Sequence, residues 1–260
     1  MIRLVYVLRR QPEMSLAGFQ KYWRGTHGPM VARHAEKLDI LRYVQLHTLD
    51  DPVNAQLAGA RGKMEAPYDG VAELWWNSRD ALAKSFMSGA GQSASRELLE
   101  DEGRFIDLPN SPMWFAHEYP QVNPTPENMV ADEHSSLVKL FFCLRHPPSQ
   151  GLEQAQLYWR TNHGPTIRRI APAMRMKRYL QVHRCEEVLE HQMRASRGTK
   201  VPPYMGHAEA WFDRADLTAV GQAPEGRRAA EIAVEDERKF IDFANSAMWI
   251  GKEWEFIDRR

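Results

Sequence analysis

Two histidines of this chain stand in the same eight-residue setting. The string YWRGTHGP at residues 22–29 returns as YWRTNHGP at residues 158–165, which is 136 residues later. Each string places a histidine, His27 or His163, directly before a Gly-Pro pair. Imidazole titrates near neutrality, so each ring is a candidate general acid or base that needs no cofactor. The alternative is structural: the ring binds a backbone carbonyl that is freed where Gly-Pro bends the chain.

A second repeated pattern, RYxQxH, carries further polar side chains at residues 42–47 and 178–183. A tyrosine beside a cavity can donate a hydrogen bond to a developing oxyanion or enolate, or it can simply fill the end of a barrel. The histidine of the pattern could pair with that tyrosine or with a glutamate, although a strand histidine is more often structural. The tyrosines and histidines are therefore further catalytic candidates, and the glutamines are substrate-binding candidates: Tyr43, Tyr179, His47, His183, Gln45 and Gln181.

Three more repeated positions are candidates for substrate binding. A buried glutamate is costly unless it is paired, so Glu73 and Glu209 are expected either to join an Arg or His or to keep a carboxyl group with a raised pKa. The tryptophan two residues further on packs in a core or stacks on a ligand ring. An arginine precedes glycine in the long loop after each second strand, where it would stand near a cavity mouth. These additional candidates are Trp75, Trp211, Arg61 and Arg197.

The repetition extends along the chain and divides it into two modules. The offset is 136 residues up to the Glu-x-Trp pairs and 135 in the last part, where FID at 105–107 matches FID at 240–242. We predict a first module at residues 1–122, a linker at 123–134 that holds two prolines, and a second module at 135–260. Each module has an ordinary domain size and can bury its own core.

Hydrophobic periodicity predicts the order βαββαβ in each module, which is the ferredoxin-like pattern and gives an α+β fold class. A helix is expected to begin at Ser15 and to break or bend at His27-Gly28-Pro29. The strands are expected at residues 4–8, 41–49, 71–76, 113–119, 138–145, 178–185, 206–212 and 247–256. The remaining helices are expected at 31–38, near 55–57, at 79–106 with a break at 88–91, and at 150–162 and 225–241.

The strand pattern then predicts where a ligand would bind. A ferredoxin-like module leaves one face of its sheet without helices, and two such faces can pack together as an α/β-barrel around an enclosed space. Because side chains alternate along a strand, Val44 and Leu46 are assigned to the helix-covered face. The helix-free face would then be polar and aromatic, as in a small-molecule pocket. Its expected residues are Tyr43, Gln45, His47, Glu73 and Trp75, with their counterparts in the second module.

Charge and composition exclude several classes of function. The chain has 34 basic and 34 acidic residues, so no net field favours nucleic acid or an anionic membrane. There is no apolar run of 18 residues and no signal-peptide start, which predicts a cytoplasmic protein. Cys143 and Cys185 are not at equivalent repeat positions, which argues against a disulfide or thiolate site. No metal, dinucleotide or phosphate motif occurs, so neither a metal nor a cofactor is predicted.

The YWRxxHGP string, together with RYxQxH and the segment YDGVAELWW at residues 68–76, resembles the EthD-domain proteins, a branch of the dimeric α/β-barrel superfamily. The resemblance covers nearly the whole chain, once in each module. It implies that the histidine of the HGP string points toward a cavity. It does not fix a reaction, because related barrels include isomerases, cyclases, monooxygenases and haem-handling proteins. The tandem arrangement departs from single-domain members, in which two chains form the barrel.

The first hypothesis for function is a cofactor-independent lyase, isomerase or cyclase. It would act on a small aromatic or lactone-like metabolite of a catabolic or polyketide-like pathway through His and Tyr acid–base chemistry. A second hypothesis is a non-catalytic binding protein that is accessory to an oxidative degradation pathway. A third is a barrel that binds haem or flavin, because a single axial histidine leaves no sequence signature. Sheet edges also make a homodimer plausible.

Overall fold

The computed structural model describes residues 1–123 and 129–260, and its strands form one closed antiparallel barrel. Around the barrel the strands follow the order β1-β3-β2-β8-β5-β7-β6-β4. In the first half the strands are β1 (Ile2–Leu8), β2 (Arg42–Thr48), β3 (Gly70–Trp76) and β4 (Met113–Val122). In the second half they are β5 (Leu137–Leu144), β6 (Arg178–Cys185), β7 (Gly206–Asp213) and β8 (Ala247–Asp258).

The two halves repeat one ferredoxin-like sheet, which confirms the predicted fold class. The order β4-β1-β3-β2 of the first half returns as β8-β5-β7-β6 in the second. Two ladders join the halves: β2 pairs with β8, and β4 pairs with β6. The barrel therefore closes within a single chain, and no second copy is needed to complete it.

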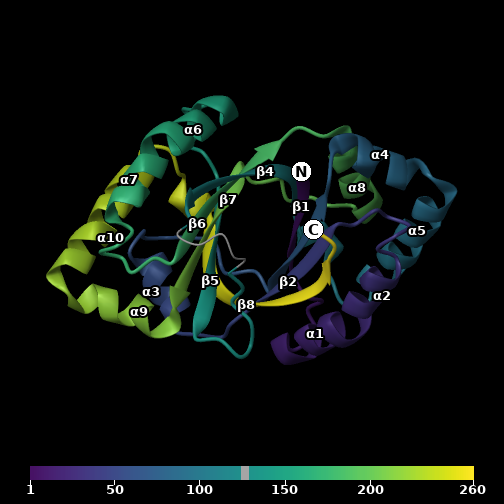
Figure 1. Cartoon of the computed structure of the whole chain (residues 1–260), viewed down its shortest axis with the longest axis horizontal. Helices are drawn as coiled ribbons and strands as arrows, with labels where there is room; N and C mark the ends of the chain where they lie inside the picture. Colours follow the sequence, from purple (N-terminus) through teal and green to yellow (C-terminus); the bar gives the residue numbers. More distant parts are fainter. Residues whose placement is uncertain (124–128) are drawn as a thin grey trace.

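Helices cover the outside of the barrel in two groups on opposite sides (Figure 1). The first-half helices are α1 (Leu16–Tyr22), α2 (Gly28–Arg33), α3 (Val53–Gly59), α4 (Arg79–Met87) and α5 (Gly89–Glu102). The second-half helices are α6 (Leu152–Tyr158), α7 (Gly164–Ile170), α8 (Val188–Arg197), α9 (Arg214–Ala219) and α10 (Pro224–Glu237). Short 3₁₀ turns occupy Leu108–Asn110, Val220–Gln222 and Phe243–Asn245. No helix of the described residues is long and apolar enough to cross a bilayer.

One helix of each half packs against the core of the other half. Val53 and Leu57 of α3 pack into the core beneath the second-half helices, whereas Leu189 and Met193 of α8 pack into the first-half core. Figure 1 shows α3 beside α9 and α10, and α8 beside α4 and α5. The prediction of a short helix near residues 55–57 is confirmed, but α8 was predicted as loop. The apolar side chains of α8 pack against the opposite module, so the residues of its own module gave no indication that this segment is a helix.

The helix that carries the HGP string bends through a π-helical turn without breaking. Ser15 caps α1 by accepting a hydrogen bond from the Gly18 amide, as its position predicts. The segment Trp23–His27 is then π-helical and leads directly into α2. A side chain on Gly28 would clash with Phe256 and the Gln45 amide unless these side chains moved, so this position favours glycine. Turns of this kind often mark functional sites.

Of the predicted linker at 123–134, residues 124–128 lie outside the described residues. In the described part, Ala131 is buried and pairs with β8. Its amide donates to Glu253 Oε2 at 2.8 Å, and its carbonyl accepts from the Glu253 amide at 2.9 Å. The division into 1–122 and 135–260 stays a prediction.

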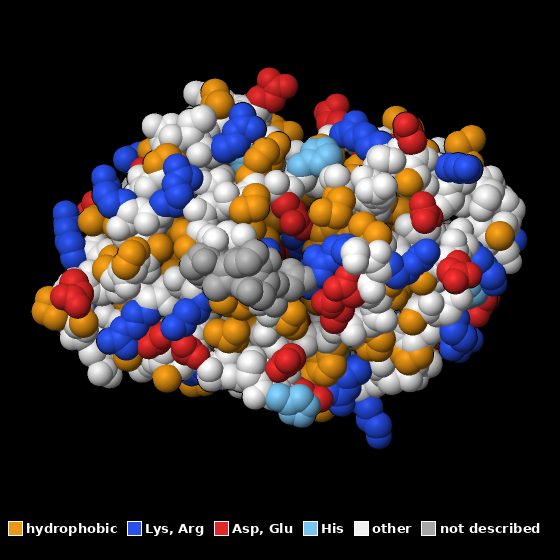
Figure 2. Space-filling view, in the orientation of Figure 1, with side chains coloured by type: hydrophobic (Ala, Val, Ile, Leu, Met, Phe, Trp, Pro, Cys, Tyr) orange, Lys and Arg blue, Asp and Glu red, His pale blue; other side chains and the backbone are white. Residues whose placement is uncertain are grey.

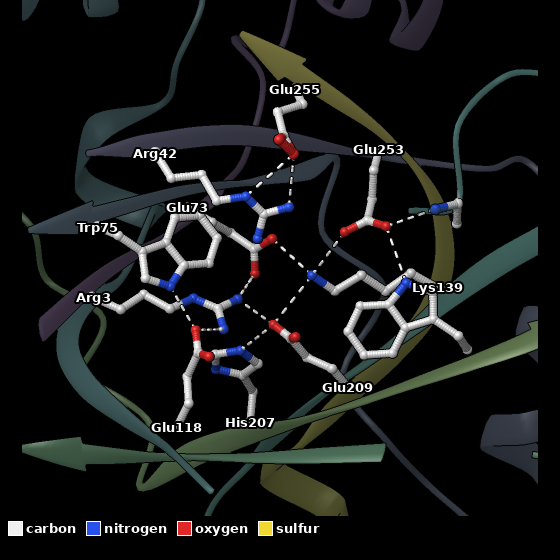
Figure 3. A network of polar contacts seen from close by, with 12 residues as sticks. Arg3, Arg42, Glu73, Trp75, Glu118, Lys139, His207, Glu209, Glu253 and Glu255 are labelled. Carbon is white, nitrogen blue, oxygen red and sulfur yellow. Dashed lines mark hydrogen bonds and ion pairs between the residues drawn. The ribbon is translucent and has the colours of Figure 1, made fainter. Parts of the chain in front are cut away.

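The interior of the barrel holds a cluster of charged side chains (Figure 3) together with an apolar cluster that includes Val5, Phe141 and Trp249. Arg3 and Lys139 occupy equivalent positions of β1 and β5 and are 1% and 2% exposed. The Arg3 guanidinium binds Glu73 and Glu209 and also reaches Glu118 at 3.1 Å. Lys139 Nζ lies 2.7 Å from Glu73 and 3.1 Å from Glu209. Figure 2, by contrast, shows charges of both signs dispersed over the outer surface.

Mutual neutralisation allows these charges to lie in the barrel. Burial by itself would raise the pKa of the Glu209 carboxyl, but Arg3 and Lys139 outweigh burial and hold that pKa well below its usual range. Burial likewise lowers the pKa of Lys139, and the nearby carboxylates oppose this shift. Each ion is costly to bury alone, so the members of this cluster depend on one another.

Replacing Arg3 by Met should therefore lower the free energy of unfolding by about 3–5 kcal/mol, because Glu73 and Glu209 would share Lys139 as their remaining ion-pair partner and Glu118 would lose its pair with Arg3. Urea denaturation at pH 7 measures the change. The control is Arg228→Met, which removes an exposed pair with Glu231 and should cost less than about 1 kcal/mol. A loss of similar size in the two variants would contradict an interdependent interior cluster.

Candidate active site

A cavity lies between the sheet and the helices of the first half, outside the barrel. It encloses about 460 Å³, which falls within the range of small-molecule sites. Its floor comes from the outer face of the sheet, and α2, α5 and α8 contribute to its walls. Apolar side chains dominate the lining, and the polar residues named below are exceptions within it. We call this cavity pocket 1. Representative lining residues are Leu4, Leu8, Val31, Ile40, Trp76 and Leu98.

His27 reaches pocket 1 from the π-helical turn and is held by a carboxylate behind it. Its Nδ1 lies 2.8 Å from Asp101 Oδ2, on α5. The Tyr22 hydroxyl donates to the other oxygen of Asp101 at 2.6 Å. The hydrogen bond with His27, in particular, lowers the pKa of Asp101, so this carboxyl is ionised at neutral pH. Because Nδ1 is hydrogen-bonded to Asp101, Nε2 is the ring nitrogen that can contact a ligand.

The second half contains a smaller copy of this arrangement, which we call pocket 2. It encloses about 290 Å³ and is lined by His163 and Tyr179. His163 Nδ1 lies 2.8 Å from Asp236 Oδ2, and the Tyr158 hydroxyl donates to the other oxygen at 2.7 Å. Burial opposes ionisation of Asp236, but hydrogen bonds from His163, Tyr158 and Lys239 lower its pKa.

An arginine from the opposite module closes each pocket. Arg197, the last residue of α8, donates to both carboxylate oxygens of Glu102 at 2.7 and 2.8 Å in pocket 1. Arg61, just beyond α3, does the same with Glu237 at 2.7 Å for both bonds in pocket 2. Both predicted arginines therefore reach a pocket. Arg197 does so from a helix and not from a loop; the left-handed Gly198 (φ 61°) ends that helix.

The predicted faces of β2 and β6 are wrong. Tyr43, Gln45 and His47 lie on the helix-covered face, whereas Val44 and Leu46 point into the barrel beside the charged cluster. The register shows why: Val44 is paired with Glu73, so the two share the inner face. The same inversion holds for β6, where Leu180 is paired with Glu209. Alternation fixes which residues share a face, but the choice between the two faces depends on what fills the barrel.

Tyr43 and Gln45 form a chain of hydrogen bonds beside pocket 1. Gln45 Nε2 donates to the Tyr43 hydroxyl at 2.8 Å and to the Trp23 carbonyl at 3.1 Å in the π-helical turn. Burial raises the pKa of Tyr43, so its phenol keeps the proton and can donate it to a ligand oxygen. Tyr43 lines the pocket, but Gln45 is not among its described lining residues. Gln45 instead holds the turn that carries His27, and Gln181 Nε2 likewise donates to the Trp159 carbonyl at 2.8 Å.

His47 and His183 pack against tryptophans behind the pockets. The His47 ring stacks on Trp23 with centroids 4.6 Å apart, and the His183 ring stacks on Trp159 at 4.3 Å. Burial, with a smaller contribution from a nearby arginine, lowers the pKa of each ring to about 3. Both rings are therefore neutral at physiological pH. This geometry favours a structural role for them over proton transfer.

Glu73, Glu209, Trp75 and Trp211 do lie on the helix-free face, as predicted, but that face encloses no ligand chamber. Among the described residues, the expected space between the sheets is occupied by the charged cluster and by apolar side chains such as Phe141 and Trp249, and a cavity of about 30 Å³ lies beside Trp75 and Trp211. The two tryptophans donate to Glu118 at 2.5 Å and to Glu253 at 3.0 Å. Of the predicted alternatives for the glutamates, ion pairing is the one observed. The predicted site thus divides between the pockets and the barrel interior.

The comparisons with known proteins agree with this architecture. The profile of the EthD domain matches residues 11–109 and again residues 147–244. The chain belongs to the EthD domain family. No curated protein matches its sequence.

Solved structures extend the likeness of the two EthD domains to the whole barrel. An anthrone oxidase-like protein superposes with a TM-score of 0.58 at 10% identity, covering 100% of this chain and 94% of the other. A dye-decolorizing peroxidase from Bacteroides thetaiotaomicron gives a TM-score of 0.51 at 10% identity, covering 96% of this chain and 92% of the other. At such identities the likeness concerns the fold alone.

Sequence reasoning missed the carboxylates of both EthD-domain pockets. Asp101-Glu102 returns as Asp236-Glu237 at the offset of 135, just before the repeated FID segment, so the repeat itself carried the signal. Tyr6 of pocket 1 carried no such signal, because Phe142 replaces it in the second domain. Arg3 was missed because its counterpart is Lys139, which preserves the charge and not the residue type.

One group in the described part of the chain has the spacing of a metal site. Ligand atoms of Glu73, His207 and Glu209 lie within 4.8 Å of one another inside the barrel. Arg3 and Lys139 already bind both carboxylates, so their positive charges would repel a further cation. We assign this group to the charged cluster.

The buried histidines predict how stability depends on pH. The pKa of His47, His183 and His207 is about 3 in the folded chain, chiefly because of burial, against about 6.5 when unfolded. Between these values the unfolded chain binds more protons, so stability falls as the pH is lowered from about 6.5. Each histidine should contribute up to about 1.4 kcal/mol per pH unit.

Urea denaturation at pH 7, 6 and 5 measures this slope. His183→Gln should reduce it by about one histidine's share, whereas His134→Gln should not change it because the His134 side chain is 86% exposed. Equal slopes in the wild-type protein and the His183→Gln variant would show that this ring is not buried as a neutral group.

Proposed function

We propose that this protein is an enzyme that acts on a small aromatic or lactone-like compound by acid–base chemistry, without a cofactor. The observation that supports the proposal is a histidine, paired with a buried carboxylate, at the wall of an apolar cavity in each EthD domain. In pocket 1 the pair is His27 and Asp101, and in pocket 2 it is His163 and Asp236. A carboxylate behind Nδ1 fixes the ring's tautomer and orientation and stabilises the imidazolium that forms after proton uptake.

The same geometry supports a specific sequence of proton transfers. His27 Nε2 takes a proton from a carbon next to a substrate carbonyl, and the C–H electron pair forms the double bond of an enolate. The negative charge moves to the carbonyl oxygen, where the Tyr43 hydroxyl donates a hydrogen bond to it. Gln45 donates to that hydroxyl, which leaves the Tyr43 proton available for the substrate. Return of the proton from His27 to a second carbon completes an isomerisation, and loss of a leaving group from the enolate completes an elimination.

A second candidate is haem binding at the same histidines. A histidine that ligates a metal usually gives its other ring nitrogen to a carboxylate, and His27 and His163 both have that arrangement. His27 or His163 would hold the haem through Nε2, and the bound haem would supply redox chemistry. Under the remaining hypothesis, a non-catalytic accessory protein, the pockets would bind a small molecule and no proton transfer would take place.

Location and assembly remain proposals. We propose a cytoplasmic protein whose partner is a small molecule and not nucleic acid or a membrane. We also propose a homodimer, in which the second copy would add to a barrel that is already closed within one chain.

Replacing His27 or His163 by Gln tests the enzymatic proposal. At least one variant should lose about 10²–10⁴-fold in turnover, because a positioned acid–base group contributes a factor of that size. Turnover is measured by mass spectrometry on a panel of lactones and cyclic aromatic ketones. The matched control is His34→Gln: His34 also pairs with a carboxylate, Glu97 at 2.9 Å, but it is not among the described residues that line either pocket.

Three outcomes separate the hypotheses. Wild-type turnover in the double variant His27→Gln/His163→Gln would overturn acid–base catalysis by these rings. Binding of panel compounds without any product would support the accessory protein. A haem absorption band that appears on titration with haem, and is lost in the double variant, would support the haem site.

A further inference from the structure

The two pockets differ in polarity as well as in size. Besides Tyr43, whose counterpart Tyr179 lines pocket 2, three residues with hydroxyl groups line pocket 1: Tyr6, Ser95 and Ser196. The residues at the equivalent repeat positions line pocket 2 and have no hydroxyl: Phe142 and Ala230 of the second half, and Ala60 of the first half. We propose that Tyr6 and Ser95 form a recognition site for an oxygen substituent of the ligand, so that pocket 1 takes a neutral oxygenated aromatic compound, whereas pocket 2 lacks this pair of hydroxyl groups.

Tyr6 provides the strongest observation. It lies on the outer face of β1 and is 4% exposed, yet its hydroxyl makes no hydrogen bond of normal geometry among the described residues. The nearby Arg197 guanidinium interacts with the hydroxyl and lowers its pKa, against the larger effect of burial, which raises it. A buried hydroxyl without a partner costs free energy, and a ligand oxygen in the pocket would remove that cost. Phe142 shows that the fold tolerates the ring without the hydroxyl at this position. The oxygen of Tyr6 is therefore not required for packing.

Ser95 gives a second and independent observation on the facing helix. Its Oγ, on α5, is also buried without a hydrogen-bond partner among the described residues. Ser196 is less informative, because its hydroxyl donates to the Met193 carbonyl at 2.9 Å within α8. Two hydroxyls without a hydrogen bond of normal geometry, from β1 and α5, thus belong to the lining of one cavity.

The charge of pocket 1 narrows the ligand class. Arg197 stands next to Tyr6, with its guanidinium 5.5 Å from the ring centroid. Glu102 engages that guanidinium through two hydrogen bonds, so the positive charge is already neutralised. A carboxylate ligand would find no free cation in this pair and would meet Glu102 as a like charge. The other arginine of the lining, Arg96, is exposed to solvent, which weakens its attraction for an anion in the pocket. A phenol or a ketone, which carries oxygen without charge, fits both the hydroxyls and the apolar walls.

Isothermal titration with 1-naphthol and naphthalene tests this inference, because the two probes differ by one hydroxyl group. We expect 1-naphthol to show one tight site per chain, with about tenfold stronger binding than naphthalene, as one hydrogen bond of about 1.4 kcal/mol predicts. Tyr6→Phe/Ser95→Ala should bring the two affinities within about twofold. The reciprocal variant Phe142→Tyr/Ala230→Ser should add a second tight site for 1-naphthol.

Equal affinities of the wild-type protein for the two probes would overturn the inference, and so would a preference that survives in Tyr6→Phe/Ser95→Ala. Thermal unfolding checks that each variant keeps its fold. The inference rests on the proposed function in taking pocket 1 as the ligand site, but titration requires no turnover. A protein that prefers 1-naphthol and catalyses nothing would keep this inference and lose the enzymatic proposal; turnover without the preference would do the reverse.

Discussion

The charged cluster inside the barrel is the constraint on which the other features depend. Arg3 and Lys139, from equivalent strands of the two halves, each bind Glu73 and Glu209 across the interface between the sheets. These ions are buried, and each is stable there because the others are present. The cluster therefore joins the two EthD domains electrostatically where the ladders β2–β8 and β4–β6 join them by backbone hydrogen bonds. It also leaves almost no room for a ligand between the sheets.

Because the barrel interior is full, the space for a ligand lies under the helices. This explains why the polar residues of β2 face outward. Gln45 must reach the π-helical turn to hold the Trp23 carbonyl, and Tyr43 must reach the cavity, so both lie on the face opposite Glu73. The π-helical turn in turn aims His27 at the cavity while Asp101 fixes its other nitrogen. One interior cluster and one irregular helical turn thus place each histidine beside its pocket.

Exchange of α3 and α8 makes each pocket a product of both domains. Arg197 closes pocket 1 from the second half, and Arg61 closes pocket 2 from the first. An isolated domain would lack this arginine and would leave Glu102 or Glu237 without its principal cation. The two pockets produced by the duplication are therefore not independent of each other. Within this shared plan the pockets have diverged, since Tyr6 and Ser95 of the first are Phe142 and Ala230 in the second.

The sequence by itself determined the duplication, the βαββαβ order of each half and the family, because an aligned repeat and strand periodicity are local properties. It also identified His27, His163, Tyr43 and Tyr179, which do line the pockets, and Arg61 and Arg197, which close them. Only the tertiary structure decided which face of β2 is outside, because alternation is symmetric until something fills the barrel. Only it paired His27 with Asp101, 74 residues away, and carried α8 to the opposite domain. Such contacts arise from packing between distant segments, which no local pattern records.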